Sequence, residues 1–354
     1  MAMDEPVFVI GYPHHIGGAN TECWHTIRLW RSLGIDVHLI PTWEASQEWR
    51  DKCDAIGCVT HEATVDTLGD VPGLRGATAV SFCNGAYWSS HDRWEALGVR
   101  VVWVNCMTMV FTWERAIAKP AAAYVFQSEY QRKCLEPELS AWGYKPSMGH
   151  LIRGALCLED FKHAPPLRKR GEPFVVGRIS RAAPDKFSRD TWKVYEAINY
   201  RPLRAIVVGY DEKVNHKLGD PPCFAEVYPA GIMSAEEFFR KIHCLVHLTG
   251  GSRENWPRCG LEAMAYGVPV VAEMNYGWPE MIQHGVSGYL GRGFHDYAHW
   301  AARLAHDQDK LFDMSWMARH RLNEMYDFRH TREKGQIGWK WLELFKELSV
   351  CASA

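Results

Sequence analysis

The sequence of 354 residues lacks the usual signatures of export, membrane insertion and disulfide bonding. Its 11 cysteines are an odd number and form no Cys-x-x-Cys pair or zinc-type spacing, which is typical of free thiols in a reducing compartment. The first residues lead directly into the apolar run Val7–Ile10, so we expect no signal peptide. No stretch approaches the roughly 18 apolar residues of a membrane span. These absences predict a soluble, cytoplasmic protein.

Net charge is nearly absent as well. The 40 Lys and Arg residues against 42 Asp and Glu residues give a formal charge of −2. This balance provides no global attraction to nucleic acid or to anionic lipid. The composition, with 47% hydrophobic and 23% charged residues, is typical of a globular protein. The length predicts two domains.

Short apolar runs alternate with glycine turns and helical segments in the first half. Pro6–Ile10 predicts a strand, Gly17-Gly18 a turn, residues 21–33 a helix, and Asp36–Ile40 a second strand. This order is typical of a parallel α/β unit. Further strands are predicted at residues 79–82, 101–104 and 123–126.

The α/β pattern restarts after a segment rich in proline and charge at 163–172, which we interpret as a linker. Strands are predicted at residues 174–177, 204–209, 244–248 and 268–272, with a helix around 193–198. A helical apolar stripe follows near the end, made of Ile337, Trp341, Leu344, Phe345 and Leu348. The chain therefore contains two successive α/β halves, which predict two Rossmann-like domains.

Two glutamates bracket seven residues in the stretch GSRENWPRCGLEAMAYGVPVVAE, residues 251–273. Glu254 and Glu262 are followed by the blocks Gly277-Trp-Pro-Glu280 and Gly285-Val-Ser-Gly-Tyr-Leu290. With these blocks in order and spacing, the second half resembles the retaining nucleotide-sugar glycosyltransferases of family 4. Weaker similarity, at the Gly17-Gly18 loop among other places, extends to the first half.

The resemblance implies the GT-B fold, in which two Rossmann-like domains face one another across a cleft. It implies an acceptor domain at 1–165, a donor domain at 166–332, and a C-terminal helix at 333–354 that packs back on the first domain. The implied substrates are a nucleoside-diphosphate sugar and a hydroxyl-bearing acceptor, with no metal or other cofactor.

The residue types fit this chemistry. An ionised carboxylate accepts two hydroxyl hydrogens at once, so a glutamate suits a diol. Glu262, expected in the first turn of a helix, resembles the residue that holds the ribose hydroxyls, and Glu254 resembles the one that faces the donor sugar. The amides of Arg258, Cys259 and Gly260 would meet the diphosphate at the helix N-terminus.

A departing nucleoside diphosphate gains negative charge, which an enzyme without a metal must neutralise with fixed cations. Arg178 and Lys186 resemble the Arg/Lys pair of the family, although their spacing is longer than usual, so Arg181 could replace one of them. Gly17 and Gly18 would let a loop approach the diphosphate closely. His243 and His247 are interpreted as strand residues.

Rival functions stay open at this point. An epimerase or hydrolase of the same fold would use the same diphosphate site, and a non-catalytic nucleotide-sugar binding module would keep only the binding residues. A phosphorylase would need a pyridoxal lysine context, which we do not find. The acceptor could be a glycan, a lipid-linked glycan, a small molecule or a modified DNA base.

Overall fold

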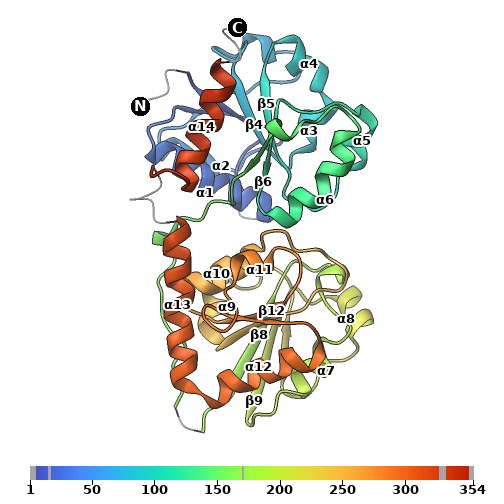
Figure 1. Ribbon diagram of the computed structural model, residues 1–354, viewed down its shortest axis with the longest axis vertical. Helices are drawn as coiled ribbons and strands as arrows, with labels where there is room; N and C mark the ends of the chain where they lie inside the picture. The colour runs from blue at the N-terminus through green and yellow to red at the C-terminus, as the bar shows by residue number, and fades with distance from the viewer. Residues whose placement is uncertain (1–4, 15–16, 170, 327–331, 351–354) are drawn as a thin grey trace. The chain divides into compact units, whose positions relative to one another are not determined.

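The computed structural model describes residues 5–14, 17–169, 171–326 and 332–350 (Figure 1). The chain divides into two compact units, one made of residues 1–157 and 326–354, and the other of residues 158–325. The domain boundaries expected from the sequence, at 165/166 and 332/333, concern acceptor and donor domains rather than these compact units, and they stay a prediction.

The first unit contains a seven-stranded parallel sheet with the order β3-β2-β1-β4-β5-β6-β7. Val7 lies opposite both Val37 and Thr78, which places β1 between β2 and β4. The central strands are nearly continuous apolar runs because both faces of a parallel sheet are covered. Their bounds are Val7–Ile10 (β1), Val37–Ile40 (β2), Val59–Thr60 (β3), Thr78–Phe82 (β4), Arg100–Val104 (β5), Ala123–Phe126 (β6) and Gly149–Leu151 (β7).

Seven helices of the first unit flank this sheet in the described ranges. They are Gly18–Ser32 (α1), Gln47–Ala55 (α2), Gly85–Ser89 (α3), His91–Ala96 (α4), Thr112–Ile117 (α5), Glu129–Ser140 (α6) and Ile337–Val350 (α14). The apolar stripe of α14 is buried except for Leu348, which is partly exposed. The ring of Trp341 packs edge-on against Trp30 of α1, with centroids 4.9 Å apart. The last helix thus belongs to the core of the first unit.

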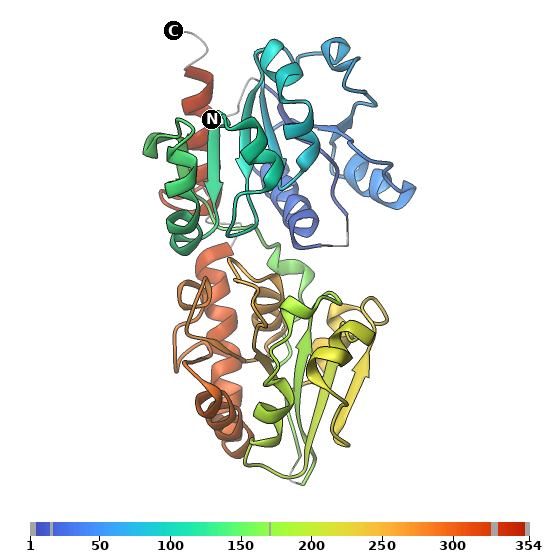
Figure 2. The same cartoon turned by 90° about the vertical axis from the view of Figure 1, so that its right-hand side faces the viewer.

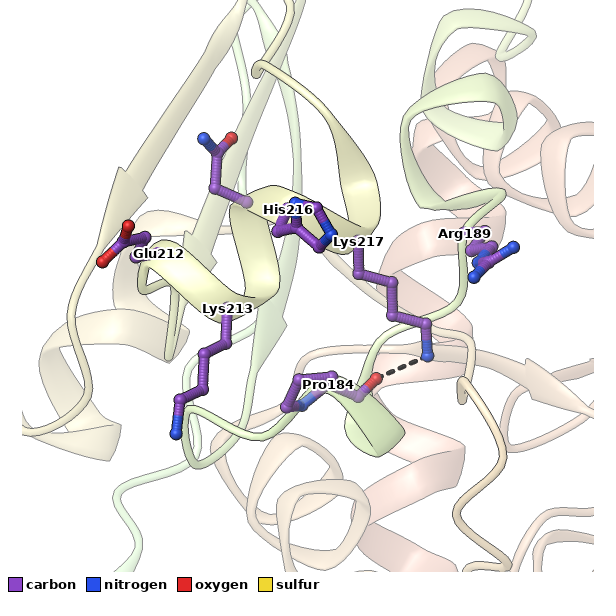
Figure 3. Close-up of a pocket in the computed structure, with 7 residues that line it drawn as sticks. Pro184, Arg189, Glu212, Lys213, His216 and Lys217 are labelled. Carbon is purple, nitrogen blue, oxygen red and sulfur yellow. Dashed lines mark hydrogen bonds between the residues drawn. The ribbon is translucent and has the colours of Figure 1, made fainter.

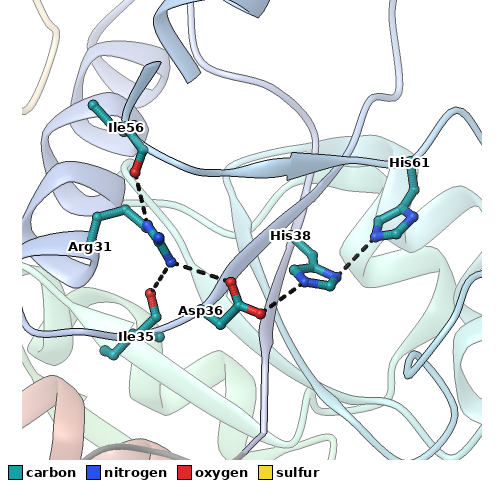
Figure 4. Close-up of polar contacts among 6 residues, drawn as sticks. All are labelled: Arg31, Ile35, Asp36, His38, Ile56 and His61. Atoms are coloured by element: carbon teal, nitrogen blue, oxygen red, sulfur yellow. Dashed lines mark hydrogen bonds and ion pairs between the residues drawn. The ribbon is translucent and has the colours of Figure 1, made fainter. Parts of the chain in front are cut away.

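A polar chain ties the edge strand β3 and its neighbour β2 to α1 (Figure 4). Arg31 donates from Nε to the carbonyl of Ile56 over 3.0 Å and forms an ion pair of 3.3 Å with Asp36. The other carboxylate oxygen of Asp36 lies 3.1 Å from Nε2 of His38, whose Nδ1 lies 2.9 Å from Nε2 of His61. Burial, and then His38, lower the pKa of His61. The short strand β3 is therefore anchored by side chains as well as by its ladder.

The second unit contains a six-stranded parallel sheet with the order β10-β9-β8-β11-β12-β13 (Figure 2). Its strands are Phe174–Ile179 (β8), Leu203–Val208 (β9), Ala225–Tyr228 (β10), Cys244–His247 (β11), Val270–Glu273 (β12) and Tyr289–Gly291 (β13). Its helices are Thr191–Glu196 (α7), Glu212–Leu218 (α8), Ala235–Lys241 (α9), Arg258–Tyr266 (α10), Trp278–Met281 (α11), Phe294–His306 (α12) and Gln308–Tyr326 (α13).

The strand order reverses direction at β8, which lies between β9 and β11. In open parallel sheets, ligands bind outside the carboxyl ends of the strands at such a switch point. The expected architecture of two parallel α/β units is confirmed. None of the helices in the described ranges combines the length and the apolar character needed to cross a lipid bilayer.

Candidate functional site

The carboxyl ends of β8, β11 and β12 carry charged and polar side chains. Arg178 is the fifth residue of β8, His247 is the last residue of β11, and Glu273 is the last residue of β12. We expected Arg178 just after its strand, but β8 continues to Ile179. Three neighbouring strands therefore deliver these groups to one edge of the sheet.

Arg178 is a buried cation, with 1% of its surface exposed. It donates from Nη1 to the carbonyl of Ile179 over 2.8 Å and from Nη2 to the carbonyl of Lys186 over 2.5 Å. Its guanidinium lies 5.2 Å from the ring centroid of Phe187. Arg178 thus fixes the 3₁₀ turn Pro184–Lys186 (η4) and places a permanent positive charge beneath it.

Lys186 and Glu254 form an ion pair. The Lys186 Nζ lies 2.9 Å from Oε1 of Glu254, and the two side chains are only 17% and 12% exposed. Sequence positions 68 apart are brought together because η4 and the loop before α10 both follow central strands. The structure therefore pairs two of the three residues expected to be catalytic, and Arg178 supports one of them.

His247 is also a member of this cluster. The sequence correctly placed it on a strand but did not connect it with the site, whereas His243 lies one residue before β11. The Nε2 of His247 lies 4.0 Å from Oε1 of Glu254, and its ring packs edge-on against Trp278 at 4.8 Å. Burial lowers the pKa of His247 well below its usual range, and the positive charges of Arg178 and Lys186 act in the same direction. The imidazole is therefore neutral at pH 7. Its position as the last residue of a central strand was the signal that could have identified it.

Glu262 lies on α10, but not in the first turn as we expected. Pro257 is the N-cap, so the helix begins at Arg258 and Glu262 is its fifth residue. Burial raises the pKa of the Glu262 carboxyl, and the charge of Arg258 opposes the shift. Hydrogen bonds from the hydroxyls of a ligand would stabilise a carboxylate that is partly removed from water.

Two glycines allow α10 and its loop to pack closely. A Cβ on Gly260 would lie 2.5 Å from the Trp278 ring, and one on Gly277 would lie 1.4 Å from the carbonyl oxygen of Asn255. The Gly260 amide donates to the Pro257 carbonyl over 3.0 Å, so it is already engaged rather than reserved for a diphosphate. The glycine of the E-x7-E stretch serves helix packing.

The thiol of Cys259 shows how closely the expected residues gather. Burial raises its pKa to about 12, and the remaining influences come from Arg178, Glu254, Glu262 and Lys186 in that order. The two cations lower the pKa of the thiol, and the two carboxylates raise it. The charges of four predicted site residues therefore all influence the Cys259 thiol.

Lys217 of α8 joins two loops of the site, and Figure 3 shows its contact with one of them, at Pro184. Its Nζ donates to the carbonyls of Pro184, over 2.6 Å, and Gly250, over 2.9 Å, and so links η4 to the loop that leads to Glu254. The same lysine, with Arg189 and Lys213 among others, lines an open pocket of about 980 Å³. This pocket adjoins the cluster but is not lined by Lys186, Glu254 or Glu262.

Three further residues were expected in the site, namely Arg181, Gly17 and Gly18. Arg181 is exposed. Gly17 and Gly18 belong to the other unit. Gly17 is the N-cap of α1 with φ +93°, and Gly18 is the first helical residue, so the left-handed conformation belongs to Gly17 alone of the two.

The polar loop residues of the first unit serve local structure. Asn84 donates from Nδ2 to the Ile10 carbonyl over 3.0 Å and to Thr42 Oγ1 over 2.8 Å, while its Oδ1 caps α3. Asn105 accepts the amide of Met107 over 2.8 Å. Both residues hold the shapes of loops at the carboxyl edge of the sheet.

One Asp-x-Asp triplet, a spacing that some glycosyltransferases use to bind a divalent ion, is present at Asp307-Gln308-Asp309. It lies at the start of α13, where Asp307 Oδ1 accepts the amide of Lys310 over 2.9 Å. Asp307 therefore caps the start of α13.

Residues 161–321, which span most of the second unit, match the family of glycosyl transferases group 1. No curated protein matches the chain by sequence. Similar solved structures include HepE of Anabaena in complex with UDP-glucose, with 16% identity, a TM-score of 0.69, and coverage of 98% of this chain and 99% of that one.

Two further structures are similar over nearly the whole chain. TarM has 11% identity and a TM-score of 0.75, with 97% of this chain and 99% of that one covered. Sucrose-phosphate synthase of Thermosynechococcus elongatus has 15% identity and a TM-score of 0.68, with 98% and 100% covered. The chain thus has the GT-B glycosyltransferase fold, and its second unit carries a domain similar to the glycosyl transferases of group 1.

Proposed function

We propose that this protein is a retaining glycosyltransferase that moves a sugar from a nucleoside-diphosphate sugar to a hydroxyl group of an acceptor. The observation that carries the proposal is the cluster at the β8–β11 switch point, where Arg178, Lys186 and Glu254 meet beside the N-terminus of α10. Carboxylates suit the hydroxyls of such a donor, and the two cations suit its diphosphate.

In the proposed reaction, Glu262 accepts hydrogen bonds from the ribose hydroxyls. Lys186 leaves Glu254 and binds the diphosphate, while the fixed charge of Arg178 stabilises the same negative charge from below. Glu254, thus released, faces the donor sugar. The neutral His247 beside Glu254 adds no competing charge.

The bond between the anomeric carbon and the phosphate oxygen then breaks, and the acceptor oxygen forms a bond to that carbon on the same face. The acceptor proton passes to the leaving phosphate oxygen, so no protein base is required. The cations would replace a divalent ion in this step, which makes the reaction independent of metal. HepE of Anabaena, solved with UDP-glucose, favours a uridine nucleotide as the first donor to test.

The test is a screen of UDP-, GDP- and ADP-sugars for transfer or slow hydrolysis by the wild type and by Glu254→Gln. We expect at least one donor to be consumed by the wild type, with retention of anomeric configuration, and a large loss of kcat in the variant. Glu196→Gln, at an exposed glutamate of α7, is the matched control. Equal rates for Glu254→Gln and the wild type would contradict the assignment, and nucleotide-sugar binding without turnover would indicate a non-catalytic module.

A further inference from the structure

The first unit has a pocket of its own at the carboxyl edge of its sheet, which we call the edge pocket. Its volume is about 580 Å³, within the roughly 300–1,000 Å³ of small-molecule sites. Its walls come from the segments that follow β2 and β3, with Trp43 and Glu62 among the lining residues. All of its lining residues belong to the first unit.

The loop that carries Trp43 is held in position by hydrogen bonds. The side-chain amide of Asn84 donates to Thr42 Oγ1 and to the carbonyl of Ile10, the last residue of β1. Gly11 has φ +118°, and a Cβ there would lie 3.1 Å from the Trp43 ring. The indole therefore rests against the backbone at the end of β1, yet 39% of the residue is exposed.

The lining combines an apolar floor with polar groups at the rim. Ile40 and Trp94 are buried beneath the pocket. Arg50 and Glu62 form an ion pair at its rim, and Glu62 remains 63% exposed. An exposed indole face packs on the apolar C–H face of a sugar ring, while a carboxylate and a guanidinium bind pairs of hydroxyls.

The charge of the lining selects among acceptor classes. One cation, Arg50, stands against two carboxylates, Glu44 and Glu62, so the pocket has an excess of negative charge. A phosphate-rich ligand such as DNA requires cations in excess. An uncharged saccharide requires none, and its hydroxyls can donate to the free carboxylate oxygens.

We propose that the edge pocket binds an uncharged saccharide as the acceptor, with Trp43 as its stacking platform and the Arg50–Glu62 pair binding its hydroxyls. The proposal rests on the proposed glycosyltransferase function, since a sugar bound there is an acceptor only if the second unit supplies a donor. It names the acceptor class and the residues that select it.

The test uses the full-length protein labelled with 5-fluorotryptophan, with the fluorine resonance of residue 43 assigned from its loss in Trp43→Phe. The probes are the uncharged methyl glycosides of glucose, galactose, mannose and N-acetylglucosamine, with glucose 6-phosphate and a short single-stranded DNA as anionic comparisons. We expect at least one methyl glycoside to shift this resonance saturably, and both anionic probes to bind more weakly.

The variants separate stacking from folding. Trp43→Ala should weaken glycoside binding, measured on the remaining resonances or by calorimetry, about 3- to 10-fold, and Glu62→Gln should weaken it as well. Trp316→Ala, which removes a 50% exposed tryptophan of the second unit, is the matched control and should leave binding unchanged. The unshifted resonances of the other tryptophans report that each variant is folded.

Failure of this proposal is distinguishable from failure of the proposed function, because glycoside binding is measured without any donor. If no uncharged glycoside shifts the Trp43 resonance, or if the anionic probes bind better, the saccharide assignment is overturned. Donor consumption with an empty edge pocket would then leave the glycosyltransferase function standing with a different acceptor site.

Discussion

The Lys186–Glu254 ion pair leads to a counterintuitive prediction about nucleotide binding. The Glu254 carboxylate pairs with the Lys186 ammonium group, to which we propose that the diphosphate binds. A nucleotide must therefore break the pair before it can bind Lys186. Removing the carboxylate charge with Glu254→Gln should tighten the binding of UDP even though it impairs transfer.

The geometry sets the size of this effect. Two unit charges 2.9 Å apart attract one another by about 6 kcal/mol at an effective dielectric constant of about 20. Most of this attraction is offset by the cost of removing both groups from water, so we expect a net coupling of about 1–2 kcal/mol. Glu254→Gln should then bind UDP about 5- to 30-fold more tightly than the wild type.

A double-mutant cycle isolates the pair. Lys186→Met should weaken UDP binding by about 1.5–3 kcal/mol because it removes a charged hydrogen bond to the diphosphate. In the Lys186→Met background, Glu254→Gln should tighten UDP binding only through relief of direct repulsion. Isothermal titration calorimetry of the four proteins gives the coupling. Unchanged or weaker UDP binding by Glu254→Gln, or equal tightening in both backgrounds, would refute the reasoning.

Three other outcomes are expected. Burial raises the pKa of the Glu114 carboxyl to about 7, so the native state holds this proton more tightly than the unfolded chain. The free energy of unfolding should therefore fall by up to about 3 kcal/mol as the pH rises from about 4.5 to 7. Glu114→Gln should remove this part of the pH dependence of Tm, and an unchanged profile would contradict the assignment. Gly260→Ala should lower the free energy of unfolding by about 1–3 kcal/mol, because its Cβ would collide with Trp278. Gly293→Ala is the control and should leave Tm nearly unchanged, because its Cβ would meet nothing within 4 Å. Equal effects of the two variants would argue against close packing at α10. Transfer should survive treatment with EDTA, and strict dependence on added Mn²⁺ or Mg²⁺ would count against neutralisation by Arg178 and Lys186.

The central strands of both sheets could be predicted because a strand that is buried on both faces consists of consecutive apolar residues. The run Val7–Ile10 is β1, and Ala123–Phe126 is β6. Short edge strands such as β3 and β7 could not be predicted in this way. They are held by the ladder and by side-chain networks such as the one through His38, which no local pattern reveals.

The residues of the candidate site could be proposed from the sequence, but the contacts among them could not. The E-x7-E stretch drew attention to Glu254 and Glu262. The position of Glu262 within α10 depended on Pro257, because this N-cap makes the helix begin at Arg258, four residues before Glu262. The Lys186–Glu254 pair and the burial of His247 arise from tertiary placement of three strands, which sequence spacing alone does not encode.

The most direct test of the account is a crystal structure of the protein with UDP bound. The account predicts the ribose hydroxyls within hydrogen-bonding distance of the Glu262 carboxylate. It also predicts the diphosphate at the N-terminus of α10, with Lys186 turned from Glu254 toward a phosphate oxygen. UDP bound instead in the pocket lined by Arg189 and Lys213, with the Lys186–Glu254 pair intact, would contradict it.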